Sequence, residues 1–142
     1  MGIDFNRHKK KVEIERLKRV SYMNNTKWRE LFQTFENNPK ITCEVVGAKI
    51  KVLSWENILP FKLFGNYHYA DYIEGAHAPI CFTEIEWIFI PANCEFERWN
   101  RNEKLQSEFI KNNIFSLKKL IDSLGLLEYD FDENGLKIYG YK

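Results

Sequence analysis

The stretch that decides the fold class runs from Ile80 to Ile90 and reads ICFTEIEWIFI. Aromatic and β-branched side chains dominate it, which favours a β-strand. Successive side chains of a strand point to opposite faces, so one face is expected to enter the core. The odd-numbered positions form that face: Cys81, Thr83, Ile85, Trp87 and Phe89. Glu84 and Glu86 lie on the other face, which we expect to be half exposed, as in an antiparallel sheet. Pro91 is expected to end the strand.

A helix is expected before this strand, from Asn25 or Thr26 to Asn37. Four apolar residues recur at helical spacing and form a single stripe: Trp28, Leu31, Phe32 and Phe35. Either Asn25 or Thr26 can accept a hydrogen bond from an unpaired N–H of the first turn. Pro39 stops the helix, because proline disfavours helical geometry in the residue before it.

The other elements indicate an α+β domain. Residues 41–46 and 49–54 are expected to pair as a hairpin around Gly47 and Ala48, followed by a short helical turn over residues 54–60. Residues 65–79 are expected to be loop. We therefore predict a mainly antiparallel sheet of about five strands packed against two or three helices.

The C-terminal third is expected to hold a long helix and a hairpin. The helix runs over residues 103–124, with Asn112–Asn113 as the place where it breaks or bends, and Gly125 caps its end. Residues 127–131 and 136–141 flank a turn rich in Asp, Asn and Gly and form the closing hairpin.

Size and charge indicate one domain preceded by a basic segment. The chain has 142 residues, and 15% of them are aromatic, which is typical of a folded protein. Residues 1–22 hold seven basic and three acidic side chains, whereas the other 120 residues hold 14 and 17. We expect a basic N-terminal arm over residues 1–22, with a short helix over residues 12–20, and a single α+β domain over residues 23–142.

Targeting and redox signals favour a cytoplasmic protein. No apolar run approaches the roughly 18 residues that a membrane span needs, and no secretory signal follows Met1. The three cysteines, an odd number without CxxC spacing, are expected to be reduced: Cys43, Cys81 and Cys94. We expect a monomer or a weak dimer that does not bind membranes.

The sharpest functional signal is residues 63–97, called the acid–aromatic block below. The block has no lysine or arginine, holds eight large aromatic residues, and carries six carboxylates: Asp71, Glu74, Glu84, Glu86, Glu95 and Glu97. Aromatic rings supply anchor area in interfaces, and carboxylates attract a basic partner. The candidate partner-binding residues are Tyr67, Tyr69, Asp71, Tyr72 and Glu74. The alternative is that the rings face the core while the acids only keep the surface hydrated.

Two other functions remain open. Glu84 and Glu86, with His68 and His77, would suit a metal-dependent hydrolase, although their spacing matches no familiar metal site. The basic arm over residues 1–22 would suit a nucleic-acid binder, the less favoured partner. The chain has no glycine-rich phosphate loop and no nucleophile motif, so we assign no catalytic residue, metal ligand or cofactor.

Three segments together resemble an uncharacterised family of small bacterial proteins, known as a domain of unknown function. They are NNTKW (residues 24–28), EIEW (84–87) and GLKIYGY (135–141). Their order and spacing agree over Met23 to Tyr141, which leaves residues 1–22 outside the resemblance. The family has no established activity, so the resemblance implies no catalytic residue. Small acidic bacterial proteins of this type are similar to immunity proteins, which neutralise cognate toxins. The favoured hypothesis is an immunity-type inhibitor that occludes a basic toxin domain, such as a nuclease.

Overall fold

The structure is a computed structural model that describes residues 5–67, 70–75 and 78–142, with side chains from residue 7 onward. Its helices are α1 (Phe5–Leu17), α2 (Asn25–Asn37), α3 (Pro39–Thr42) and α4 (Ile114–Asp122), with a 3-10 turn η1 (Phe82–Glu84). Its strands are β1 (Lys49–Val52), β2 (Leu59–Pro60), β3 (Tyr72–Ile73), β4 (Ile80–Cys81), β5 (Ile85–Pro91), β6 (Asn93–Asn100), β7 (Glu103–Lys111), β8 (Tyr129–Asp132) and β9 (Gly135–Tyr139).

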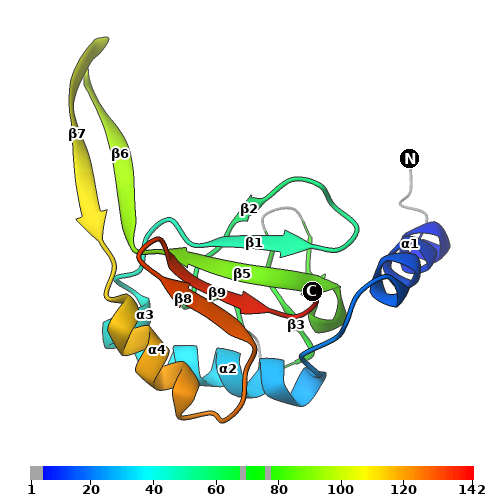
Figure 1. Cartoon of the computed structure of the whole chain (residues 1–142). Coiled ribbons are helices and arrows are strands. Elements are labelled where there is room, and N and C mark those ends of the chain that lie inside the picture. Colours follow the sequence, from blue (N-terminus) through cyan, green and yellow to red (C-terminus); the bar gives the residue numbers. More distant parts are fainter. Residues whose placement is uncertain (1–4, 68–69, 76–77) are drawn as a thin grey trace.

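The main sheet is antiparallel and has five strands in the order β2-β1-β5-β9-β8. The helices α2, α3 and α4 lie together on one side of it (Figure 1). Two further sheets have two strands each, β3 with β4 and β6 with β7. This arrangement confirms the predicted α+β fold.

The helix α2 follows the sequence prediction closely. Asn24, one residue earlier than expected, caps it, because its side chain accepts a hydrogen bond of 2.8 Å from the Lys27 N–H. The whole predicted stripe is buried: Trp28, Leu31, Phe32 and Phe35. The Phe32 ring lies 5.6 Å from the Trp28 ring and 5.3 Å from the Phe82 ring, centre to centre. The contact between the Phe32 and Phe82 rings therefore joins α2 to η1 across the core.

The central strand is shorter than predicted, and only Ile85 of its predicted inner face is fully buried. Residues 82–84 form η1 rather than strand, and the register shifts where Val52 pairs with Ile85. The turn and the irregularity change the alternation, so Ile88 and Ile90 are buried whereas Trp87 and Phe89 are only half buried. Cys81 and Thr83, also predicted to face the core, are exposed.

Three other sequence predictions are wrong. Residues 41–46 do not form a strand, because Pro39 begins α3, where the Thr42 hydroxyl donates to the Phe35 carbonyl at 2.9 Å. Residues 59–60 form the edge strand β2 rather than the end of a helical turn. Residues 103–111 form β7 rather than helix, so only α4 remains of the predicted helix over residues 103–124.

The break predicted at Asn112–Asn113 has a clear structure. Asn113 caps α4 by accepting a hydrogen bond from the Ser116 N–H at 3.1 Å. Asn112 is buried, and its side chain hydrogen-bonds both backbone groups of Val46, at 3.0 and 2.8 Å, and the Pro91 carbonyl at 2.8 Å. One side chain therefore ties together the segment before β1, the end of β5 and the start of α4.

The predicted closing hairpin is present as β8 and β9. The Asp132 side chain accepts hydrogen bonds from the Asn134 and Gly135 N–H groups at 2.8 and 3.3 Å. Gly135 has φ +150°, and a side chain there would collide with the Ile90 carbonyl oxygen. Only glycine fits this close approach between β9 and β5.

The N-terminal segment packs against the body. Val12 of α1 is buried with Leu53 and Tyr141 in a small cluster of its own. Val20 and Lys142 exchange backbone hydrogen bonds of 3.0 Å, and Ser21 bridges Tyr141. Within the described ranges, no helix is long and apolar enough to cross a membrane.

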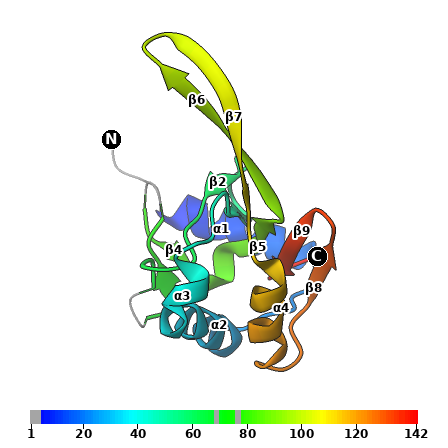
Figure 2. The same ribbon diagram turned by 90° about the vertical axis from the view of Figure 1, so that its left-hand side faces the viewer.

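The strands β6 and β7 form a two-stranded ribbon over residues 93–111, called the ribbon below, that extends away from the body (Figures 1 and 2). Its turn is Arg101–Asn102, where both residues have positive φ, 56° and 77°. Two such residues are typical of the tight turn that matches the twist of paired strands.

Candidate functional site

The acid–aromatic block does not form a surface of one sign, because bases from outside the block meet most of its carboxylates. The Arg29 guanidinium lies 2.6 Å from the Asp71 carboxylate, and the His8 ring lies 3.2 Å from Glu84. Lys104 lies 3.7 Å from Glu97. Residues 63–97 contain no lysine or arginine, but the folded chain brings bases from other segments next to their carboxylates.

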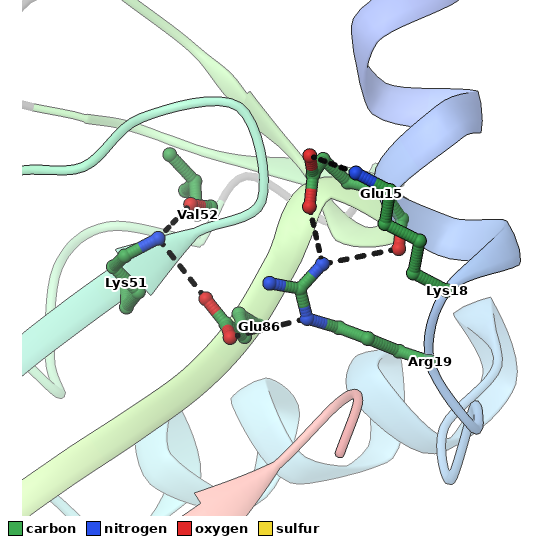
Figure 3. Close-up of polar contacts among 6 residues, drawn as sticks. All are labelled: Glu15, Lys18, Arg19, Lys51, Val52 and Glu86. Atoms are coloured by element: carbon green, nitrogen blue, oxygen red, sulfur yellow. Dashed lines mark hydrogen bonds and ion pairs between the residues drawn. The ribbon is translucent and has the colours of Figure 1, made fainter.

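Glu86 lies at the centre of the largest of these charge clusters (Figure 3). Its carboxylate is 3.0 Å from Lys51 Nζ and 3.4 Å from Arg19 Nε. Arg19 also donates to Glu15 at 2.6 Å, and this contact lowers the pKa of Glu15 and raises the pKa of Arg19. The cluster ties the segment after α1 to the sheet, which is a structural role for Glu86.

The predicted hydrolase residues are not brought together as one strand face. Glu84 belongs to η1 and Glu86 to β5, and each has its own basic neighbour. His68 and His77 lie outside the described residues. Among the residues that are described, no group of three or more His, Cys, Asp or Glu side chains could hold a metal ion.

The predicted partner-binding residues fall into three environments. Tyr67 is buried, with its ring 6.0 Å from the Phe32 ring and 6.1 Å from the Phe82 ring, so it is part of the core. Tyr69 lies outside the described residues. Asp71, Tyr72 and Glu74 are exposed, and Tyr72 begins the short strand β3.

Glu74 lines a groove of about 600 Å³, called the groove below. The groove lies among β1, β2, β4 and the root of β6. Most of its lining is apolar and includes Ala48, Ile50, Leu59, Phe61, Ile80 and Phe96. Lys62, Asn66 and Glu74 supply its polar groups. A concave, mostly apolar lining with a few polar groups is the usual form of a ligand-binding site.

The acid–aromatic block supplies one wall of this groove. Asn66, Glu74, Gly75, Ile80 and Phe96 all come from residues 63–97, and the opposite wall comes from residues 45–62. Tyr72, two residues before Glu74, has 39% of its surface exposed. The block therefore contributes to a concave surface, although its charge is largely offset.

Sequence reasoning counted Phe96 only as one of the aromatic residues of the block, and it missed the ribbon. Polar and apolar side chains alternate over residues 93–97, which is the signal that could have predicted a strand there. Phe96 reaches the groove from the ribbon's root, and Cys94 packs so close to Gly47 that a side chain at that glycine would meet its sulfur. All three cysteines are free thiols; Cys43 and Cys81 are exposed and Cys94 is half buried.

Comparison with known proteins gives one match. A family model described as a family of unknown function (DUF6678) matches residues 10–142. The match begins upstream of Met23, so it includes the segment over residues 10–22 that sequence analysis placed outside the resemblance. No curated protein and no solved structure matches the chain.

Proposed function

Because the chain belongs to DUF6678, a family of unknown function, we propose its function from its surface: it is a protein-binding protein that holds a partner in the groove. The single observation that supports this is the position of the acid–aromatic block. The block supplies one wall of an apolar groove. The exposed Asp71 and Tyr72 immediately precede Ile73 and the groove residue Glu74 in the chain.

The groove suits a partner segment with an apolar anchor and a basic neighbour. Apolar side chains would enter between Leu59, Ile80 and Phe96, where burial of about 100 Å² of apolar surface contributes roughly 2.5 kcal/mol. Glu74 at the rim would contact a basic side chain of the partner. Tyr72 would add aromatic area, because tyrosine is enriched at binding hot spots.

The narrower form of this proposal is an immunity-type inhibitor that occludes a basic toxin domain, such as a nuclease. The groove and its rim would cover the toxin's functional surface. Asp71 contributes less than the sequence suggests, since Arg29 already neutralises its carboxylate at 2.6 Å. Anchoring in the groove, rather than long-range attraction, then supplies most of the affinity.

Capture of the tagged full chain from its native lysate tests this proposal. The groove variant carries Tyr72→Ala and Glu74→Lys, and the matched control carries Glu133→Lys, an exposed carboxylate in the turn between β8 and β9. The wild type and the control should retain one stoichiometric partner that the groove variant loses. Equal capture by the groove variant would contradict the proposal.

The narrower form has its own test. A captured toxin should arrest growth when it is expressed alone, and co-expression with the wild-type chain should restore growth. Restoration by the groove variant to the wild-type level would contradict the inhibitor mechanism.

A further inference from the structure

The ribbon extends from the body with little to support it. In the described part of the chain, β6 and β7 pair only with each other. Their root is held by the Asn112 N–H, which donates to the Ala92 carbonyl at 2.9 Å, and by Phe96 in the groove. An isolated two-stranded ribbon is marginally stable in water. A second molecule that covers the outer part of the ribbon would therefore stabilise it.

One face of the ribbon combines large rings with charges. Residues paired across antiparallel strands share a face. Glu95 pairs with Phe109, and Trp99 pairs with Lys104. Trp99 has 58% of its surface exposed and Phe109 has 70%. Glu97 contacts both Lys104, at 3.7 Å, and the Trp99 indole N–H, at 3.4 Å, so it lies on this face as well. We call this face the aromatic face.

The charges on the aromatic face are divided by strand. The acids Glu95 and Glu97 lie on β6, and the bases Lys104 and Lys111 lie on β7, where Lys111 pairs with Asn93. A second ribbon turned by 180° about the ribbon's long axis would place its β6 over the β7 of the first. The acidic strand of each copy would then lie over the lysine-bearing strand of the other, with Lys104 opposite Trp99 and Phe109 opposite Glu95. The two faces are therefore opposite in charge strand by strand.

The overall charge of the ribbon points the same way. Residues 93–111 contain four acidic and four basic side chains, so two ribbons carry no net repulsion. The opposite face is less available near the root, because Phe96 lines the groove and Cys94 packs against Gly47. The aromatic face is thus the surface that can be covered along the ribbon's whole length.

We propose that two copies of this chain associate through the aromatic faces of their ribbons, about a two-fold axis parallel to the ribbons. The contact is isologous: both copies use the same surface, and each contact occurs twice, related by the two-fold axis. Trp99 and Phe109 supply the buried apolar area, and the strand-divided charges set the orientation. The dimer uses a surface separate from the groove, so it neither depends on the proposed partner nor blocks it.

Sedimentation equilibrium of the full chain tests the dimer. One variant, Glu95→Lys with Glu97→Lys, makes the aromatic face wholly basic, and another, Lys104→Glu with Lys111→Glu, makes it wholly acidic. The wild type should self-associate at concentrations up to about 100 µM, and each variant alone should associate at least about tenfold more weakly. An equimolar mixture of the two variants should form a heterodimer that high salt weakens.

All four substituted residues are exposed, so the variants should fold, and unchanged thermal unfolding checks this. A third variant, Trp99→Ser with Phe109→Ser, should also be monomeric. A monomeric wild type at these concentrations, or two charge variants that fail to associate when mixed, would overturn the proposal. If the wild type is monomeric and the Trp99→Ser/Phe109→Ser variant no longer captures the partner, the ribbon instead binds that partner. The groove variant should dimerise like the wild type. Sedimentation therefore tests the dimer, and capture of a partner tests the proposed function, independently of each other.

Discussion

Replacing Asn112 by alanine should lower the free energy of unfolding by about 3 kcal/mol. The Asn112 side chain is buried and makes three hydrogen bonds, two with Val46 and one with the Pro91 carbonyl. Alanine would leave three backbone groups without these partners. Each unpaired buried group costs about 1–3 kcal/mol, and partial access of water at this site favours the lower value.

This loss is large for a chain of this size, whose total stability is expected to be about 5–15 kcal/mol. Urea unfolding followed by tryptophan fluorescence measures it, and the midpoint temperature should fall by about 10 °C. Asn113→Ala is the matched control. That neighbour caps only α4, through the Ser116 N–H, and its loss should cost about 1 kcal/mol. If Asn112→Ala stays within about 1 kcal/mol of the wild type, the side chain does not join the three segments as described.

Three further predictions concern other parts of the fold. A chain that begins at Met23 should unfold about 2 kcal/mol more easily than the full chain, because it loses the burial of Val12, and equal stability would mean that α1 does not pack as described. Arg101→Gly should slow hydrogen exchange of the ribbon amides by relieving the positive φ of 56°, whereas faster exchange would contradict the turn geometry. Burial, together with the hydrogen bond to Asp130, raises the pKa of Tyr139 to about 12. The neutral phenol is thus favoured by folding, so its contribution to stability is complete below pH 10 and is lost as the pH rises through 12. Titration of phenolate absorbance should show this tyrosine ionising late, and Asp130→Asn should bring its pKa down.

The helix α2 could be predicted because its signals are local. The stripe from Trp28 to Phe35 repeats at helical spacing, and Pro39 marks its end. The closing hairpin was predictable for the same reason, since Asp132 and Gly135 supply the turn chemistry within four residues.

The ribbon could not be predicted from the same kind of signal. Leu105 and Phe109 are four residues apart, which matches a helix, and the apolar stretch after Asn113 continues that pattern into α4. Its turn also lacks the usual glycine, since Arg101 and Asn102 both adopt positive φ. Pairing with β6, a contact between separate segments, decides the outcome.

The candidate site was predicted only in part for a related reason. Sequence showed that residues 63–97 lack lysine and arginine, but ion pairs form between distant segments, as between Arg29 and Asp71. Glu74, one of the candidate partner-binding residues, lines the groove, a feature that the sequence did not predict. Phe96 was counted among the block's aromatic residues but not among the candidate partner-binding residues, because its place in the groove depends on where the ribbon leaves the body.

Hydrogen exchange of the full chain with and without its captured partner tests the central claim most directly. The partner should slow exchange at the groove, over residues 45–50, 59–62 and 72–75, while the ribbon outside its root remains unchanged. Protection confined to the ribbon or to the helices, with none at the groove, would contradict the account.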